Sequence, residues 1–194
     1  SFPTRRSSDL ELLRPKILAK EPLSLSLVQT IHRTLTEGTY DERRYITNGE
    51  RPGAFKKHDY VTGKNEVGSP PEAVADDLTE LIEEVNAIGA QAPLKAGAYF
   101  HARFENIHPF ADGNGRVGRT LLNYWLMINH YPPLVIYEED RRAYYDALQT
   151  YDEQEDLAPL VTFLEEQTVK TWSRFLKPPA GNAPPRKGLN FFMN

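Results

Sequence analysis

Residues 108–119 read His-Pro-Phe-Ala-Asp-Gly-Asn-Gly-Arg-Val-Gly-Arg, a dense run of polar and small residues. Apolar residues recur at helical spacing on both sides of this run, over about 93–107 and about 116–132. Pro132 and Pro133 end the second of these segments. The pattern predicts a short polar loop held between two amphipathic helices, and the rest of the chain is interpreted around that pair.

The remaining sequence predicts four more helices and one irregular segment. Ser24 can cap a helix that ends near Gly38, and Ser69-Pro70-Pro71-Glu72 has the pattern of a capping box before a helix that ends at Gly89. Two later helices are predicted over about 140–151 and 157–175. Glycine and proline interrupt residues 39–68, which favours loop and hairpin structure. The predicted fold class is therefore all-α, a helical bundle with a small β-hairpin flap.

Composition is that of an ordinary globular protein. Of the 194 residues, 40% are hydrophobic and 26% are charged, and the net charge is −4. This balance gives no global basic field for nucleic acid, so we expect no nucleic-acid partner. We find no apolar run of membrane-spanning length and no signal peptide, and the chain has no cysteine. These features favour a cytoplasmic protein with no membrane partner.

The first ten residues, SFPTRRSSDL, carry no apolar period. They match, codon by codon, the DNA sequence TCT TTC CCT ACA CGA CGC TCT TCC GAT CT, which resembles a widely used sequencing adapter. We interpret residues 1–10 as an adapter-derived artefact rather than a genuine disordered N-terminus, and we expect the natural protein to begin further upstream. The folded domain is predicted over 11–176, and the stretch 177–194 is a Pro- and Gly-rich tail.

The loop has the chemistry of an anion site. Gly113 and Gly115 let the backbone approach a phosphate closely, and the N-terminus of the following helix directs its free N–H groups to the same place. Arg116 and Arg119 lie three residues apart on one helix face and can both bind phosphate oxygens.

Two further residues of the loop add reactive groups. Asp112 offers a hard oxygen ligand for a Mg²⁺ ion that accompanies the phosphates, and His108 is suited to proton exchange near neutral pH. Each residue alone has a simpler reading as a turn, a solvated face, a structural histidine or a helix cap. All these functions fall within twelve positions, which the simpler readings do not require.

The loop matches the signature H-x-F-x-[DE]-G-N-G-R-x-x-R and therefore resembles the Fic family. The resemblance extends over about residues 22–175 and includes Ile31-His32-Arg33, Pro70-Pro71, Phe104-Glu105-Asn106-Ile107 and the Tyr144-Tyr145 pair. It implies an all-helical core, Mg·ATP as co-substrate and transfer of AMP to Ser, Thr or Tyr hydroxyls of proteins.

The resemblance also implies roles for single residues. His108 would be the base, Phe110 the apolar anchor of the loop, and Asp112 the Mg²⁺ ligand. The ATP- and phosphate-binding set would comprise Asp112, Gly113, Asn114, Gly115, Arg116, Val117, Gly118 and Arg119. Within it, Asn114 would help to cradle the inner phosphates, Arg116 would bind them, and Arg119 would bind the γ-phosphate. Tyr144, Tyr145 and Asp152 stand where the family lines its nucleoside pocket, although the family often has Asn at the position of Asp152.

The expected partners are ATP and a protein target that pairs with the flap at about 45–68 as an added strand. The alternative is an ordered loop with no binding role. Many members carry an inhibitory helix with the pattern [ST]-x-x-x-E-[GN]. Here Glu37 and Glu105 precede Gly or Asn, and Arg33 and His101 stand where the pattern needs Ser or Thr. We expect an inhibitor lost upstream in cis or supplied in trans.

Two other functions stay open. One is the same fold transferring another phosphate-containing group or removing AMP. The other, from a different class, is a catalytically silent interaction module.

Overall fold

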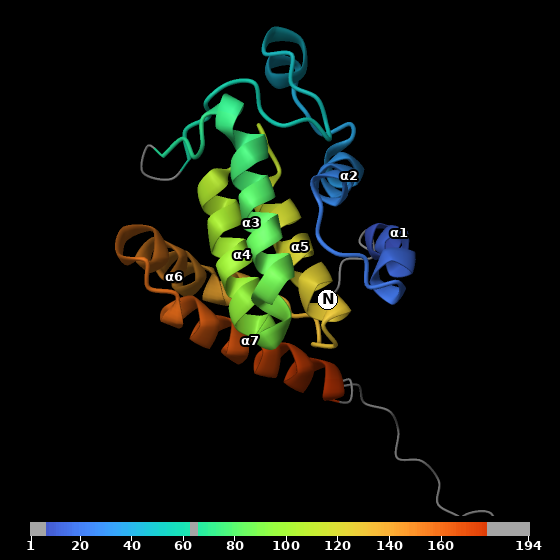
Figure 1. Cartoon of the computed structure of the whole chain (residues 1–194), viewed down its shortest axis with the longest axis vertical. Helices are drawn as coiled ribbons and strands as arrows, with labels where there is room; N and C mark the ends of the chain where they lie inside the picture. The colour runs from blue at the N-terminus through green and yellow to red at the C-terminus, as the bar shows by residue number, and fades with distance from the viewer. Residues whose placement is uncertain (1–6, 63–65, 178–194) are drawn as a thin grey trace, which may run out of the picture.

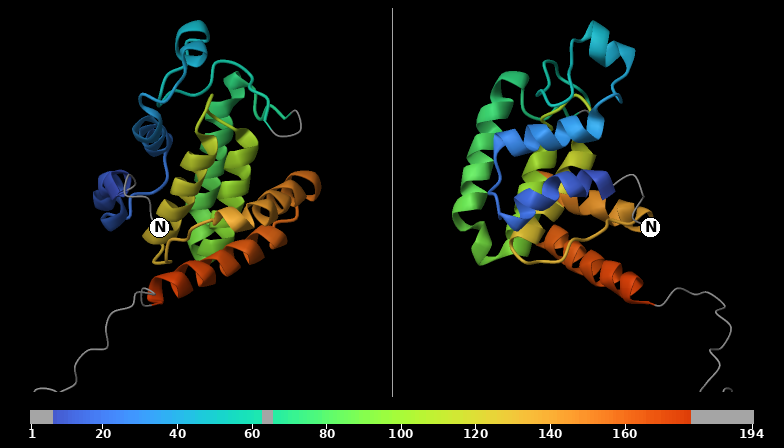
Figure 2. Two further views of the ribbon diagram at one scale, coloured as in Figure 1. Left: turned by 180° about the vertical axis from the view of Figure 1, so that it is seen from behind. Right: turned by 90° about the vertical axis from the view of Figure 1, so that its right-hand side faces the viewer.

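The computed structural model describes residues 7–62 and 66–177, and every regular element in that part of the chain is a helix. In chain order the elements are α1 (Ser7–Leu18), α2 (Leu25–Thr36), η1 (Arg43–Thr47), η2 (Pro71–Ala73), α3 (Val74–Ile88), η3 (Gly89–Gln91), α4 (Pro93–Ile107), α5 (Asn114–Ile128), η4 (Glu138–Asp140), α6 (Arg141–Gln154) and α7 (Ala158–Leu176). The helices α3, α4 and α5 run side by side through the centre, with α1 and α2 on one flank and α6 and α7 on the other (Figures 1 and 2). The predicted all-helical core is thus confirmed.

The core forms where the apolar stripes of these helices meet. The largest fully buried side chains come from α2, α3, α4, α5, α7 and the loop before α5: Leu27, Leu78, Phe100, Phe104, Ile107, Phe110, Leu121, Leu122, Tyr124, Leu126, Leu160 and Leu164. Tyr124 is buried with its polar end satisfied, because its hydroxyl donates to the carbonyl of Glu21. The close packing of α4 against α5 holds the loop between them at one end of the bundle.

Local sequence signals explain several helix ends. Ser24 caps α2 as predicted, since its hydroxyl accepts a hydrogen bond from the N–H of Leu27 at 3.0 Å. The capping box predicted at Ser69 is wrong. The Ser69 hydroxyl donates to the Asp77 carboxylate at 2.6 Å, and a short 3₁₀ turn, η2, starts the helix instead.

The segment 45–68, called the flap segment below, leaves the bundle between α2 and α3 (Figure 1). Thr62 and Glu66 form one antiparallel bridge, with N–H to O distances of 2.7 and 3.0 Å, and residues 63–65 lie outside the described residues. No strand is assigned in the described part of the segment, so the predicted hairpin is reduced to this bridge. Its backbone bonds go elsewhere: Lys56 N–H donates to Pro109 O at 2.9 Å, and Ser69 N–H, just beyond the segment, donates to Ile107 O at 3.0 Å.

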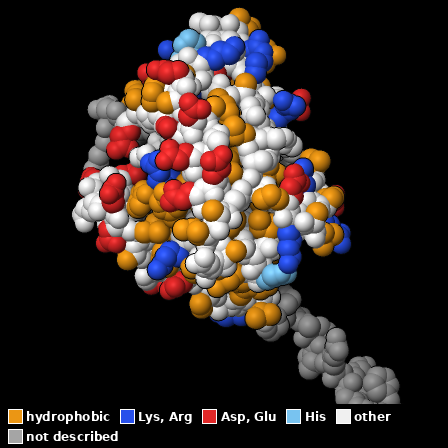
Figure 3. Space-filling model, in the orientation of Figure 1, with side chains coloured by type: hydrophobic (Ala, Val, Ile, Leu, Met, Phe, Trp, Pro, Cys, Tyr) orange, Lys and Arg blue, Asp and Glu red, His pale blue; other side chains and the backbone are white. Residues whose placement is uncertain are grey.

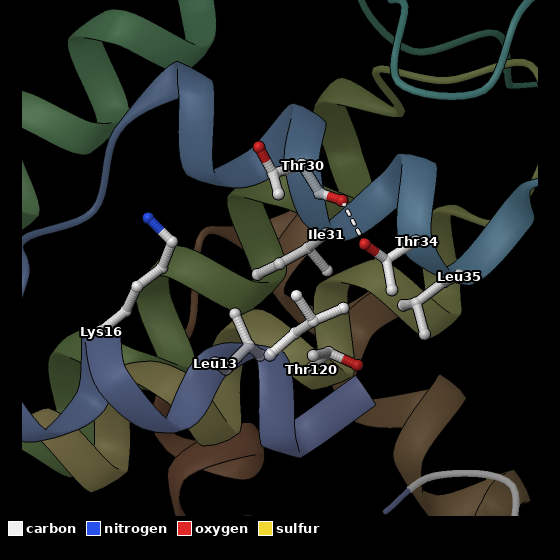
Figure 4. A pocket seen from close by; sticks show the side chains of 8 residues that line it. Leu13, Lys16, Thr30, Ile31, Thr34, Leu35 and Thr120 are labelled. Atoms are coloured by element: carbon white, nitrogen blue, oxygen red, sulfur yellow. Dashed lines mark hydrogen bonds between the residues drawn. The ribbon is translucent and has the colours of Figure 1, made fainter. Parts of the chain in front are cut away.

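The structure adds a helix that sequence patterning did not predict. Helix α1 crosses the expected boundary at residue 10, and Leu13 from α1 is buried in the core. An apolar pocket lies between α1, α2 and α5, lined by Leu13, Ile31, Leu35 and neighbouring residues, with Lys16 at its edge (Figure 4). This pocket contains no residue of the 108–119 run. The adapter interpretation of residues 1–10 stays a prediction, and residues 1–6 lie outside the described residues.

Helix α7 ends at Leu176, and the predicted tail, apart from its first residue, lies outside the described residues. Within the described residues, no helix combines the length and apolar character that a membrane span requires.

Candidate functional site

The motif loop, residues 108–113, joins the end of α4 to the start of α5. His108 follows α4 directly and adopts the left-handed conformation at φ 51° and ψ 63°. Gly113, at φ 83°, stands immediately before α5. A β-carbon on Gly113 would come within 2.7 Å of the Thr36 side chain, so both the backbone angle and the space require glycine. These two left-handed residues turn the chain so that the N-terminus of α5 faces the same side as His108.

Asn114 fastens this loop from the first turn of α5. Its amide oxygen accepts from the N–H of Phe110 at 2.9 Å, and its amide nitrogen donates to the carbonyl of Phe110 at 2.7 Å. The same nitrogen lies 3.2 Å from Nε2 of His108. The side chain is 4% exposed and engaged within the loop. The part of Asn114 left for the predicted phosphate cradle is therefore its backbone N–H.

Phe110 anchors the loop in the core, and it rests on a histidine that sequence reasoning did not single out as functional. Phe110 is fully buried and stacks on the ring of His32, with ring centroids 3.7 Å apart and planes 4° apart. The Nδ1 of His32 accepts from the N–H of Gly53 at 2.8 Å, so Nε2 carries the proton and donates to the carbonyl of Asp112 at 2.9 Å. One neutral imidazole thus ties the flap segment to the motif loop.

One sequence feature indicates that His32 is buried and hydrogen-bonded. It follows Val28 by four residues and so stands on the apolar face of α2, where a polar side chain is out of place. Burial lowers its pKa to about 4, and the Asp112 carbonyl opposes that shift. The sequence alone did not show which groups it would bind, because Gly53 and Asp112 are brought to it by the fold.

The start of α5 forms the side of the site that is predicted to face phosphate. The first intrahelical bond of α5 runs from the N–H of Val117 to the carbonyl of Gly113, so the preceding N–H groups have no helical acceptor. The Arg119 guanidinium folds back along the helix: a β-carbon on Gly115 would meet its Nη1 at 3.0 Å. Arg116 is exposed and donates to the carbonyl of Leu35 at 3.1 Å. Asp112 is exposed beside this helix end.

Two members of the predicted phosphate-binding set pack inside the bundle. Val117 is fully buried, and Gly118 lies against α4, where an added β-carbon would meet Oε1 of Glu105 at 2.5 Å. The structure gives both residues a packing role that brings α4 and α5 together. Their contact with phosphate stays a prediction.

The two adjacent tyrosines of α6 point in different directions. Tyr144 is 2% exposed, and its hydroxyl lies at hydrogen-bonding distance from Nε2 of the buried His101. Tyr145 is 54% exposed, and its ring lies 5.2 Å from that of Tyr144. Of this pair, only Tyr145 has a ring that is exposed at the surface. Asp152, one further position of the predicted nucleoside pocket, accepts from the Asn106 amide at 3.3 Å.

The environment of His108 keeps its imidazole neutral. Burial, together with the positive charge of Lys56, lowers its pKa to about 4. Lys56 is itself buried in the flap segment, and its ammonium donates to the carbonyl of Val67 at 2.7 Å. At neutral pH His108 can therefore accept a proton.

The residues at this helix end fit a magnesium nucleotide. No cluster of three metal-ligating side chains occurs in the described ranges. Mg²⁺ bound with a nucleotide needs few protein ligands, because it is held by one or two carboxylates together with the substrate's phosphates. The single exposed carboxylate of Asp112, beside the unpaired N–H groups of α5, is such a donor set.

Comparison with known proteins agrees with this geometry. Residues 22–126 match the model of the Fic/DOC family. Protein adenylyltransferase Fic from Drosophila persimilis is 32% identical over 162 residues, which are 82% of this chain and 32% of that protein. The enzyme of the same name from Aedes aegypti is 43% identical over 84 residues, or 43% of this chain and 17% of the relative.

A solved structure shares the fold. The crystal structure of a Fic domain containing signaling protein from Bacteroides thetaiotaomicron has a TM-score of 0.73 at 26% identity, covering 86% of this chain and 67% of that one. The present chain spans about a third of the length of the Drosophila relative. The family match covers more than half of the chain and includes the whole motif loop, so this chain belongs to the Fic/DOC family.

Proposed function

We propose that this chain transfers AMP from ATP to a hydroxyl side chain of a target protein. The observation that carries the proposal is the neutral, half-buried imidazole of His108 beside the unpaired N–H groups at the start of α5. A base and an anion site at one point are what in-line phosphoryl chemistry on a hydroxyl needs. The curated relatives named above carry the name protein adenylyltransferase, which supports the same activity.

The reaction balances with groups that this chain contributes. His108 takes the proton of the target hydroxyl as its oxygen attacks the α-phosphorus of ATP. The bond between the α-phosphorus and the bridging oxygen breaks, and pyrophosphate leaves with its electron pair. When bound, Mg²⁺ neutralises phosphate charge, and Asp112 is the residue that would hold it. The N–H groups of α5 stabilise the charge that develops on the phosphoryl oxygens.

The arginines divide the rest of the triphosphate between them. Arg116 is exposed at the rim of the helix end and would bind the inner phosphates. Arg119 folds over Gly115 and would meet the γ-phosphate. The exposed ring of Tyr145 would stack on the nucleoside. No ion pair within 4.0 Å involves Arg119 in the described part of the chain. An inhibitory carboxylate would then come from sequence outside these residues, in cis, or from a partner protein.

The target would dock on the flap segment. Tyr45, Ile46 and Val61 are 44%, 69% and 66% exposed, and basic side chains gather at the same end of the molecule, whereas acidic side chains lie over α3 (Figure 3). The bridge between Thr62 and Glu66 would nucleate a hairpin that an extended target segment lengthens by strand pairing. Because Lys56 and Ser69 bond to the carbonyls on either side of His108, a docked target is held next to the base.

Labelled ATP tests this function directly. The protein is incubated with a cell lysate and with ATP labelled at either the α- or the γ-phosphate. Retention of the α-label alone is expected, with loss of transfer and near-normal ATP binding in His108→Ala, because His108 acts on the hydroxyl. Retention of the γ-label would show phosphorylation instead. ATP binding without transfer would indicate AMP removal, which is tested on AMP-modified protein, and no binding at all would indicate a silent interaction module.

A further inference from the structure

A polar cluster lies largely buried behind the phosphate-facing side of α5, and of its members only Arg119 takes part in the reaction above. It comprises Glu105 and His101 from α4, Arg119 from α5 and Tyr144 from α6. His101 is fully buried, and the Oε1 atom of Glu105 is buried with no hydrogen-bond partner. A buried carboxylate oxygen without a partner is costly, so its place in a well-packed bundle calls for a reason.

The carboxylate of Glu105 fits against α5 because residue 118 is glycine and has no side chain. An added β-carbon on Gly118 would stand 2.5 Å from Oε1 of Glu105, so the carboxyl group lies against the backbone of α5 one residue before Arg119. The positive charge of the Arg119 guanidinium acts electrostatically on the carboxyl group of Glu105, although the two form no ion pair within 4.0 Å. Glu105 therefore acts on Arg119 through space, without a direct contact.

The charged and titratable groups facing Glu105 come from three helices. Arg119 stabilises its ionised form, whereas Asp152 of α6 disfavours that form. The Tyr144 hydroxyl is neutral because burial raises its pKa, and His101 is neutral because burial lowers its pKa to about 4. Burial dominates for Glu105 and raises its pKa to about 7. This carboxyl group thus changes charge in the neutral range while its neighbours do not.

We propose that Glu105 is a positioning residue that tunes the affinity for the γ-phosphate through Arg119. The ionised carboxylate draws the guanidinium towards α4 and lowers the positive potential at the phosphate site, whereas the neutral carboxyl group leaves Arg119 to the ligand. This role rests on the proposed function, in which Arg119 binds the γ-phosphate of ATP. ATP is affected more strongly than ADP, because only ATP reaches Arg119.

The test measures the affinity of the whole chain for Mg·ATP and Mg·ADP by calorimetry at pH 6 and pH 8. In the wild-type protein we expect ATP affinity to fall about fivefold or more from pH 6 to pH 8, and ADP affinity to change about twofold or less. Glu105→Gln has nearly the same shape and no charge, so its ATP affinity should not show this fall. The exposed Glu83→Gln on α3 is the matched control and should behave as the wild type. Protonation of ATP itself is common to all three proteins and cancels in the comparison.

Three results would overturn the proposal. They are the same pH profile of ATP affinity in the wild type and Glu105→Gln, equal pH effects on ATP and ADP affinity, or loss of the pH effect in Glu83→Gln to the same extent as in Glu105→Gln. Failure of the wild-type protein to bind ATP would overturn the proposed function together with this role. If Glu105→Gln does not fold, carbon NMR of the wild-type carboxyl groups gives the decision. One glutamate must titrate near pH 7 and perturb Arg119 signals at the same midpoint, and its absence refutes the proposal.

Discussion

Replacing His32 by Phe tests whether one imidazole ties the flap segment to the motif loop. The new ring keeps the stack on Phe110, which isolates the loss of the two ring nitrogens. The buried N–H of Gly53 loses its acceptor, and the carbonyl of Asp112 loses its donor. Each unpaired group costs about 1–3 kcal/mol, and the more accessible Asp112 carbonyl lies at the low end of that range. We therefore expect a loss of about 2–4 kcal/mol in the free energy of unfolding.

Thermal unfolding and magnesium titration measure the effect. For a chain of this size the loss corresponds to a fall in melting temperature of about 5–12 °C. Because the Asp112 backbone is no longer held, transfer by His32→Phe should also need more Mg²⁺ for half-maximal activity. The exposed His58→Phe in the same segment is the control and should melt with the wild type. A melting temperature for His32→Phe within about 2 °C of the wild type, at an unchanged magnesium requirement, would refute the reasoning.

Four further predictions follow from the site. Gly118→Ala should lower the free energy of unfolding by about 1–3 kcal/mol, because its β-carbon meets Oε1 of Glu105 at 2.5 Å; urea denaturation checks this, and a second change of Glu105 to Ala should restore part of the loss. Arg119→Ala should weaken ATP binding more than ADP binding, and equal losses in calorimetry would contradict its assignment to the γ-phosphate. Lys56→Met should raise the pKa of His108, because it removes a neighbouring positive charge; the acid limb of the transfer rate then moves to higher pH, unlike in Lys56→Arg. Acid should destabilise the protein, because the pKa values of His32, His101 and His108 are lowered to about 4 in the folded state. Their contribution to the free energy of unfolding is complete above the unfolded pKa of 6.5 and is lost as the pH falls through 4. The raised pKa of Glu105, about 7, acts in the opposite direction, so urea titrations between pH 6.5 and 4.5 should show a net loss of about 2–3 kcal/mol per pH unit, and a flat profile would contradict these shifts.

The parts of the fold that the sequence predicted correctly depend on local patterns. Helices α2 to α7 follow apolar periodicity, and Ser24 marks the start of α2 through its own chemistry. The motif loop was predicted at its true place because its residue types carry their chemistry within twelve consecutive positions. Helix α1 was missed because it has no clear apolar face and contains Pro15.

The features that could not be predicted depend on contacts between distant segments. His32 and Glu105 are polar residues whose burial is decided by α5 and by the flap segment. Tyr144 and Tyr145 share one sequence signal, but adjacent residues on a helix point about 100° apart, so one became core and the other surface. The flap hairpin was overestimated because the described part of the segment pairs only at Thr62 and Glu66, while the N–H of Lys56 bonds to Pro109 of the motif loop.

The left-handed backbone of His108 sets stability against the proposed chemistry at this position. An L-residue with a side chain loses about 1–2 kcal/mol in this conformation, whereas Gly and Asn accept it readily. A change of His108 to Gly or Asn would therefore abolish the base and make the bundle more stable at the same time. Backbone preference and the proposed base chemistry therefore favour different residues at this one position. The same two substitutions should therefore give a stable form of the protein that lacks the proposed base.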